Sequence, residues 1–364
     1  MKRFTFCLLA AALMAFTAVS CSDDDPYIDE PGNEEGPVYQ ESTVGLFVLN
    51  SGKMGNNNAA LTYYDMTTKQ VSTGVFEIAN GKKLGDTGNS MVVYGNKMYI
   101  AVTNSAMIFV TDLKGNLLKE ITVAGESANM SPRQLAKVNG KVYVSFMEGY
   151  VGAIDTANFS VKTVKVGPMP EGMAYSNKKV YVANSDGYNW PYGTTVSVID
   201  PTSFTVTKTL EVSNNPQTLH VAANNTLYLI CWGDYGEVPA KLQKINTSND
   251  LVTTVEDVVP TNMTVGKDGI AYILSSVYDA DWNQTITYYT FDTAKGKIIG
   301  EFVSSADVPD GYCISADDLT GNVYIGASDY VSNGDVYIIT PDGQIINKFD
   351  TGAMNPIAIC PIRK

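Results

Sequence analysis

The sequence predicts an all-β fold, a seven-bladed β-propeller of four-stranded blades. Three observations support this prediction: a short motif recurs along the chain, a tyrosine-centred strand recurs in step with it, and the two ends hold complementary incomplete repeats. A four-stranded sheet of about 45 residues cannot bury both its faces alone, so tandem units of this size are expected to pack side by side in a ring. A pair of β-sandwiches, the alternative for an all-β chain of this length, explains neither the period nor the ends.

The recurring motif is a proline followed three residues later by a large apolar or aromatic residue. It occurs at Pro132, Pro170, Pro216, Pro260, Pro309 and Pro356, and Gly88-Asn89-Ser90-Met91 takes the place of a member before them. A tyrosine among apolar, mostly branched residues recurs with the same spacing, at Tyr99, Tyr143, Tyr181, Tyr228, Tyr272 and Tyr324. We expect the motif to begin the first strand of each unit and the tyrosine run to form the second.

Two more strand-like segments complete each unit. After Pro170 they are TVSVID at 195–200 and TVTKTLEV at 205–212, with a turn between them. At the start of the chain, GLFVLN, ALTYYDM and VSTGVFEI (45–50, 60–66 and 71–78) are expected to be second, third and fourth strands without a first. MNPIAICPI at 354–362 has the first-strand motif with nothing after it. It is therefore expected to join the N-terminal blade and close the ring, which removes the open sheet edges.

The N-terminus divides into a predicted signal peptide at 1–20 and an acidic flexible tether at 21–43, before the propeller at 44–364. Lys2 and Arg3 precede an apolar stretch too short for a comfortable membrane span, and Ala18-Val19-Ser20-Cys21 resembles a bacterial lipobox. We expect lipidation at Cys21 and anchoring to a membrane through it. The alternative is an ordinary secretory signal cleaved near Ser20.

The acidic residues that follow indicate where the protein is displayed. Cys21-Ser22-Asp23-Asp24-Asp25 resembles the acidic export tag of Bacteroidetes lipoproteins at the cell surface. We therefore expect a lipid-anchored protein of the outer membrane that faces the cell exterior. The alternative interpretation of these residues is a solvated linker. The formal net charge of the chain is −13, and no basic patch is present, so nucleic-acid binding is not expected.

Catalytic motifs are not found. His220 is the only histidine and lies in an apolar run, where a structural role is expected. The sequence has no H-E-x-x-H, P-loop or nucleophile elbow, so we expect no catalytic residues, no bound metal and no cofactor. Cys231, Cys313 and Cys360 lie in apolar runs without C-x-x-C spacing, which favours buried hydrophobic positions over disulfides or a zinc site.

The predicted connections between second and third strands are rich in aromatic residues. All three tryptophans lie in them, and in a propeller these loops share one face with the connections between blades. Exposed aromatic rings contribute large contact areas for little lost entropy, so this face is expected to bind a ligand. The alternative is that some rings pack over blade edges as small cores. The candidate ligand-binding residues are Tyr188, Trp190, Tyr192, Trp232, Tyr235, Tyr278, Trp282, Tyr330, Asn57, Arg133 and Phe146.

A family resemblance extends over residues 45–362. The repeat of Pro-x-x-hydrophobic, V-Y-V-A-N and V-S-V-I-D resembles the YncE-like seven-bladed propellers. The opening segment VLNSGKMGNNNAALTYYD at 48–65 is similar to the Bacteroidetes lipoprotein branch of that group. This branch includes the BtuG-type surface proteins, which capture cobalamin and other corrinoids and sit as a lid on an outer-membrane TonB-dependent cobalamin transporter.

The resemblance implies a non-catalytic surface lipoprotein that binds cobalamin or another corrinoid and delivers it to such a transporter. Cobalamin would then be a transported ligand rather than a cofactor. Arg133 is expected on the same face, where it would meet the phosphate of the nucleotide loop of the corrinoid. Three alternatives stay open: a glycan-binding surface protein, a structural or adhesive surface-layer protein, and a propeller lactonase or lyase.

Overall fold

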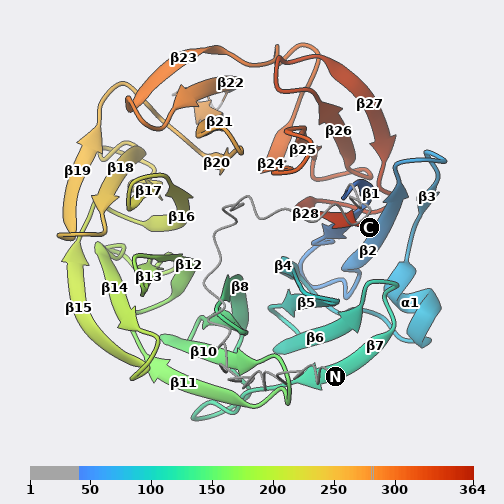
Figure 1. Cartoon of the computed structure of the whole chain (residues 1–364), viewed down its shortest axis with the longest axis horizontal. Helices are drawn as coiled ribbons and strands as arrows, with labels where there is room; N and C mark the ends of the chain where they lie inside the picture. The colour runs from blue at the N-terminus through green and yellow to red at the C-terminus, as the bar shows by residue number, and fades with distance from the viewer. Residues whose placement is uncertain (1–40, 280, 282) are drawn as a thin grey trace, which may run out of the picture. The chain divides into compact units, whose positions relative to one another are not determined.

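The computed structural model describes residues 41–279, 281 and 283–364, which form a ring of seven four-stranded antiparallel sheets (Figure 1). The predicted fold class is therefore confirmed. Blade 1 consists of β28, β1, β2 and β3, and blades 2 to 7 each take four consecutive strands, beginning with β4–β7 and ending with β24–β27. The first strand of each blade is innermost and the fourth is outermost (Figure 1).

The strands of each class have the following bounds. The innermost strands are β28 (Pro356–Arg363), β4 (Gly88–Tyr94), β8 (Pro132–Val138), β12 (Pro170–Ser176), β16 (Pro216–Ala222), β20 (Asn262–Val265) and β24 (Gly311–Ala316). The second strands are β1 (Thr43–Asn50), β5 (Lys97–Val102), β9 (Lys141–Phe146), β13 (Lys179–Asn184), β17 (Thr226–Cys231), β21 (Ile270–Tyr278) and β25 (Val323–Ala327). The third strands are β2 (Ala60–Asp65), β6 (Met107–Asp112), β10 (Tyr150–Asp155), β14 (Thr195–Asp200), β18 (Lys241–Asn246), β22 (Gln284–Asp292) and β26 (Asp335–Ile339). The outer strands are β3 (Val71–Ser72), β7 (Leu117–Ile121), β11 (Val161–Lys165), β15 (Thr205–Glu211), β19 (Leu251–Val255), β23 (Lys297–Glu301) and β27 (Ile345–Asp350).

Blade 1 closes the ring and also holds the one departure from the predicted strands. As predicted, β28 pairs antiparallel with β1, from Thr43 opposite Arg363 to Asn50 opposite Pro356. The predicted fourth strand at 71–78 is wrong beyond β3, because α1 (Val75–Asn80) replaces its second half. Gly74 and Gly81 flank the helix at φ 63° and 65°, a conformation that glycine adopts without a Cβ clash.

The hydrophobic core is divided among the blade interfaces. Seven clusters of buried side chains are found in the described chain, and each joins two neighbouring blades. The repeated tyrosines of the second strands lie in these clusters with their rings buried. The Tyr181 hydroxyl donates to Asp250 of the next blade at 2.8 Å, and that of Tyr228 donates to the Thr293 carbonyl at 2.7 Å. The tyrosine repeat therefore contributes buried rings to the blade interfaces, and Tyr181 and Tyr228 add hydrogen bonds across them.

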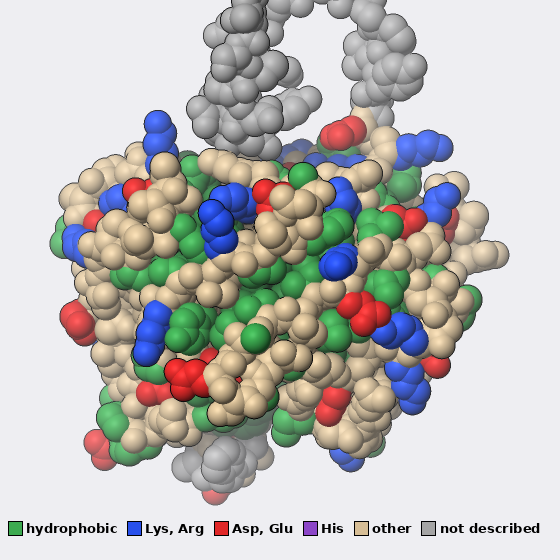
Figure 2. All heavy atoms as spheres, turned by 90° about the horizontal axis from the view of Figure 1, so that it is seen from below, with side chains coloured by type: hydrophobic (Ala, Val, Ile, Leu, Met, Phe, Trp, Pro, Cys, Tyr) green, Lys and Arg blue, Asp and Glu red, His purple; other side chains and the backbone are tan. Residues whose placement is uncertain are grey.

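The two ends of the blades differ, and we name them by their connections. The loop face holds the second-to-third-strand loops and the connections between blades, which hydrogen bonds such as Ser185 N–H to the Met169 carbonyl and Trp232 N–H to the Asn215 carbonyl join together. The turn face, at the opposite end, holds the turns between first and second and between third and fourth strands. On the side wall between them, basic and acidic side chains intermingle (Figure 2). No helix in the described ranges has the length and apolarity needed to cross a bilayer.

Candidate binding face

Exposed aromatic side chains gather on the loop face of blades 4 to 7. Trp190 and Tyr235 are 71% and 70% exposed, Tyr188, Tyr278 and Tyr330 are each more than half exposed, and Tyr192 is half-buried. We call these residues the aromatic face: Tyr188, Trp190, Tyr192, Tyr235, Tyr278 and Tyr330. Clustered exposed apolar groups are typical of surfaces that bind another molecule.

The rings of the aromatic face form two groups. In blades 4 and 5, Tyr192 contacts Trp190 and Tyr235 edge-on, with centroid separations of 5.6 and 5.8 Å and interplanar angles of 82° and 88°. In blades 6 and 7, Tyr330 contacts Tyr312 edge-on at 5.5 Å. Burial raises the pKa of the Tyr330 phenol, and the charge of nearby Tyr278 raises it further. Edge-to-face packing holds the rings of each group against one another.

An aspartate stabilises each of the aromatic loops. Asp234 accepts hydrogen bonds from the N–H groups of Gly236 and Val238, at 2.9 and 2.7 Å. Asp329 does the same for Val331 and Ser332, and these bonds lower its pKa to about 2. Asp186 and Asp279 bond side chains or backbone groups within their own loops in the same way.

Backbone conformation shows how firmly these loops are fixed. Tyr235 and Tyr330 have φ angles of 58° and 62°, a left-handed conformation that is uncommon for bulky residues and raises their energy. The Asp234 and Asp329 bonds hold the chain in that conformation. The exposed rings are therefore pre-positioned before any ligand arrives, which lowers the entropy lost on binding.

Polar side chains at the start of the innermost strands form a collar around the ring axis. Arg133 of β8 donates from Nε and Nη2 to Glu171 of β12, at 2.7 to 3.1 Å, and from Nη1 to Asn89 of β4 at 3.1 Å. One network therefore links three blades. On the other side, Gln217 of β16 donates to Asn215, which in turn donates to the Tyr235 hydroxyl at 3.3 Å. The collar thus reaches the aromatic face.

Within the collar, Arg133 and Glu171 form an ion pair. Burial raises the pKa of Glu171, and the charge and hydrogen bonds of Arg133 oppose the rise. The two-point contact pairs the guanidinium with this carboxylate, and the expected contact of Arg133 with a ligand phosphate stays a prediction. Burial also raises the pKa of Tyr312 to about 12, and Arg133 lies near enough to oppose that rise. Because the charges of Arg133 and Glu171 offset each other, this pair adds no net charge to the collar.

Three further predicted residues occupy other settings. Phe146 ends β9 with 1% exposure and packs between blades 2 and 3, so its expected contact with a ligand is wrong. The strand continues to Phe146 before the loop begins, which places the ring in the core. Trp232 is half-buried, packs against the cluster between blades 5 and 6, and donates from Nε1 to the Thr261 carbonyl at 3.0 Å. Asn57 is exposed in the blade 1 loop. Trp282 lies outside the described residues.

Sequence reasoning missed the collar residues Asn89, Glu171, Gln217 and Tyr312. A signal for them existed, because Arg133, Glu171 and Gln217 each follow the repeated proline directly, and Asn89 follows the corresponding glycine. Arg133 alone was predicted as a ligand-binding residue at this repeated position, and its equivalents were not compared with it.

The histidine and the described cysteines lie in apolar settings. His220 of β16 contacts the Thr218 hydroxyl at 3.0 Å, and burial lowers its pKa to about 4, so its imidazole is neutral at pH 7. Cys231, Cys313 and Cys360 are free, and burial raises the pKa of each thiol, to about 12, 12 and 11. Among the residues that the structure describes, no group of three or more His, Cys, Asp or Glu side chains could hold a metal ion.

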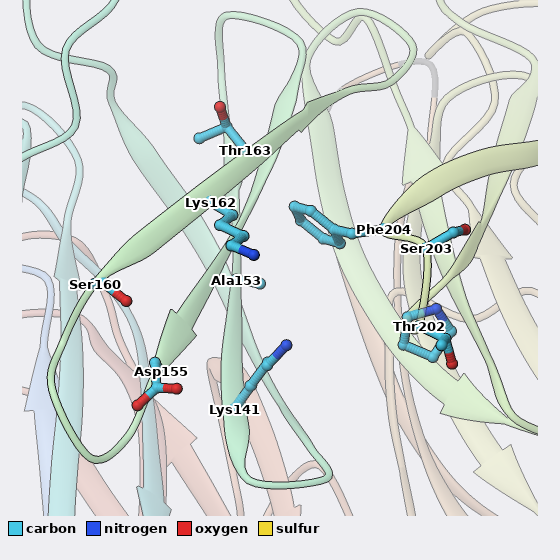
Figure 3. Close-up of a pocket in the computed structure, with 10 residues that line it drawn as sticks. Lys141, Ala153, Asp155, Ser160, Lys162, Thr163, Thr202, Ser203 and Phe204 are labelled. Atoms are coloured by element: carbon cyan, nitrogen blue, oxygen red, sulfur yellow. The ribbon is translucent and has the colours of Figure 1, made fainter.

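Two clefts lie away from the aromatic face. One, of about 520 Å³, lies between the outer parts of blades 3 and 4 toward the turn face and is lined by Lys141, Asp155, Lys162 and Phe204, among others (Figure 3). The other, of about 330 Å³, lies between blades 1 and 2 and is lined by Phe47, Tyr63, Ser72, Val75, Leu113 and Lys114. Neither cleft is lined by a residue of the aromatic face.

Comparison with known proteins assigns a family. The model of the family described as "Domain of unknown function (DUF5074)" matches residues 44–350, and the chain belongs to this family. No curated protein matches the chain.

Solved structures support the fold. A quinonprotein alcohol dehydrogenase-like protein from Bacteroides thetaiotaomicron is 14% identical, with a TM-score of 0.64, over 88% of this chain and 78% of that one. The hydrazine synthase of Kuenenia stuttgartiensis is 15% identical, with a TM-score of 0.60, over 76% of this chain and 95% of that one. At these identities the likeness concerns the fold alone.

Proposed function

We propose that this member of the DUF5074 family is a non-catalytic binding protein that captures a large, partly flat ligand on its aromatic face. The observation that carries the proposal is the gathering of pre-positioned, exposed rings at one end of the propeller beside a polar collar. Apolar platforms with a few fixed polar groups are the usual composition of ligand sites.

We propose a corrinoid such as cobalamin as the ligand. A corrinoid combines a broad ring system with amide groups around its rim, and it would meet aromatic rings and amide-bearing side chains here. Asn89 and Gln217 supply amides, and the hydroxyls of Tyr312 and Tyr235 supply further hydrogen-bonding groups. The resemblance to the BtuG-type surface proteins supports the same ligand.

The same proposal includes the location and the partner. Lipidation at Cys21 and the acidic tag at Asp23–Asp25 would anchor the protein to the outer membrane, facing outward. From there it would pass its ligand to a TonB-dependent cobalamin transporter. Replacing Asp23, Asp24 and Asp25 with Ala should leave a lipidated protein that proteases added to whole cells no longer reach. Unchanged cleavage would remove the role of the tag.

Isothermal titration of the purified protein with cyanocobalamin tests the ligand. The expected result is saturable, one-to-one binding that Trp190→Ala weakens. Absence of binding at micromolar protein would reject the corrinoid.

A glycan is the second candidate ligand, because exposed rings such as Trp190 and Tyr188 also stack on sugars. Retention on polysaccharide affinity gels, lost in Trp190→Ala, would favour it over a corrinoid.

A further inference from the structure

The propeller repeat supplies an internal comparison for the cleft between blades 3 and 4. At the next interface, Lys179 and Lys208 of blade 4 hold the carboxylate of Asp250 from blade 5. Lys179 Nζ lies 3.3 Å from both Asp250 oxygens, and Lys208 Nζ lies 3.2 Å from Oδ2. The side chain of Asp250 is 8% exposed, and the Tyr181 hydroxyl also donates to it. Two lysines at this position of a blade therefore bind a carboxylate from the neighbouring blade.

The same two lysine positions occur in blade 3. Lys141 begins β9 as Lys179 begins β13. Lys162 of β11 pairs with Ala153, which lies two residues before the end of the third strand, β10. Lys208 of β15 pairs with Val198, which likewise lies two residues before Asp200, the end of the third strand β14. Within the described ranges, no ion pair or hydrogen bond engages either ammonium group of Lys141 or Lys162.

The residue that faces these lysines is different. Phe204 and Asp250 close equivalent turns: the Phe204 N–H donates to the Asp200 carbonyl at 2.8 Å, and the Asp250 N–H donates to the Asn246 carbonyl at 2.7 Å. Their φ angles are 52° and 59°. Blade 4 thus presents a phenyl ring where blade 5 presents a carboxylate. Figure 3 shows Lys141 and Lys162 extending toward Phe204 across the cleft.

The rest of the cleft lining indicates the kind of ligand. Ser160, Thr163, Thr202 and Ser203 contribute hydroxyl groups, and Phe204 contributes an apolar ring. Asp155 also lines the cleft, and its carboxylate accepts hydrogen bonds from the N–H groups of Ala157 and Asn158, at 2.9 and 3.1 Å. The volume of about 520 Å³ lies within the range of small-molecule sites.

We propose that this cleft is a second binding site, which takes a hydroxyl-rich carboxylate of sugar-acid type. Lys141 and Lys162 hold its carboxylate as Lys179 and Lys208 hold that of Asp250. The serine and threonine hydroxyls bond its hydroxyl groups, and its C–H face packs on Phe204. The site lies toward the turn face and is separate from the aromatic face.

Ligand-observed NMR titration of the full-length protein with D-glucuronate tests this proposal, with D-glucose and acetate as matched probes. Saturable glucuronate binding is expected, with glucose and acetate each at least about tenfold weaker, because one lacks the charge and the other the hydroxyls. Absence of glucuronate binding, or equal binding of either probe, would overturn the proposal.

Variants locate the site. Lys162→Gln should weaken glucuronate binding about tenfold. Lys208→Gln, at the equivalent position of blade 4, should have no effect, because that lysine already holds Asp250. Phe204→Asp should restore the carboxylate that blade 5 has and abolish binding by occupying both lysines. Trp190→Ala should leave glucuronate binding unchanged.

The contrary outcomes are equally specific. If Lys162→Gln binds normally, or if Trp190→Ala loses glucuronate binding, the cleft is not the site. Because Lys162 is exposed, its variant is decisive even if Phe204→Asp fails to fold.

Discussion

The turn face and the loop face of the same blades follow different rules. On the turn face, Asp65, Asp112, Asp155, Asp200 and Asp292 each end a third strand and accept hydrogen bonds from backbone N–H groups of the turn that follows. On the loop face, the connections range from 147–149 in blade 3 to 185–194 in blade 4. One end repeats its residues, while the other varies both length and composition.

This difference separates the residues that make the ring from those that bind. A turn that must return the chain to the next strand has one good solution, so blade after blade uses it. A loop that meets a ligand is free to differ in each blade, and Trp190, Tyr235 and Tyr330 lie in the longer connections at 185–194, 232–240 and 328–334. Predictions of stability should therefore concern the repeated residues, and predictions of binding should concern the irregular loops.

The largest expected effect is on a repeated residue. Tyr181→Ala removes a fully buried ring and its hydrogen bond to Asp250, so the free energy of unfolding should fall by about 3–5 kcal/mol. Urea unfolding measures this loss. Ligand binding should change only in proportion to the folded fraction. A stable Tyr181→Ala protein would show that the blade interfaces do not depend on the tyrosine repeat.

The next effect concerns the aromatic face. Trp190→Ala should weaken ligand binding by about 2 kcal/mol, or roughly thirtyfold, because rings at the centre of an interface are often its strongest contributors. Its unfolding free energy should change by less than about 0.5 kcal/mol, since the ring is 71% exposed. Titration and urea unfolding of the same preparation give both numbers. If Trp190→Ala lowers stability but leaves the affinity of the folded protein unchanged, Trp190 stabilises the ring, and the distinction between the two faces is wrong.

A smaller effect is expected from the aspartates that fix the loops. Asp329→Ala removes the bonds to Val331 and Ser332, so Tyr330 should become mobile and binding should weaken about threefold to tenfold. Asp65→Ala is the matched control on the turn face, since Asp65 bonds Thr67 and Thr68 in the same way. It should lower stability slightly and leave affinity unchanged. If Asp329→Ala and Asp65→Ala lose affinity equally, Asp329 does not support binding by fixing its own loop.

The fold was predictable because its determinants repeat. Proline, tyrosine and the strand spacing each occur several times, so one misread unit does not hide the period. The segment 71–78 was misread because Val71, Phe76 and Ile78 suit a strand, and the helix depends on glycines at both ends and on packing of Phe76 against Phe109. That contact is made in space and has no local signal.

The candidate site was predictable only in part. The aromatic loops are visible in the sequence because tryptophan is rare and all of it falls in one loop class. The pairing of Arg133 with Glu171 was not, because the two residues meet only when neighbouring innermost strands lie side by side. Phe146 shows the opposite error, since one residue of strand length decides whether a ring faces a ligand or the core.

The last expected effect concerns the burial of His220 in β16. Burial lowers its pKa to about 4, against about 6.5 in an unfolded chain. Above pH 6.5 the imidazole is neutral in both states and contributes nothing. As the pH falls from 6.5 toward 4, the unfolded chain takes up a proton that the folded chain does not, so stability is lost. Between pH 7 and 5.5 this loss should be about 1 kcal/mol.

His220→Gln provides the comparison, because the substituted chain cannot take up that proton. The wild-type unfolding free energy, measured in urea at each pH, should fall below that of His220→Gln as the pH is lowered, by the amount given above. Burial raises the pKa of Glu171, which acts in the opposite direction, but it does so in both proteins and cancels in their difference. If the two pH curves run parallel, the His220 imidazole is solvated in the folded protein and burial does not lower its pKa.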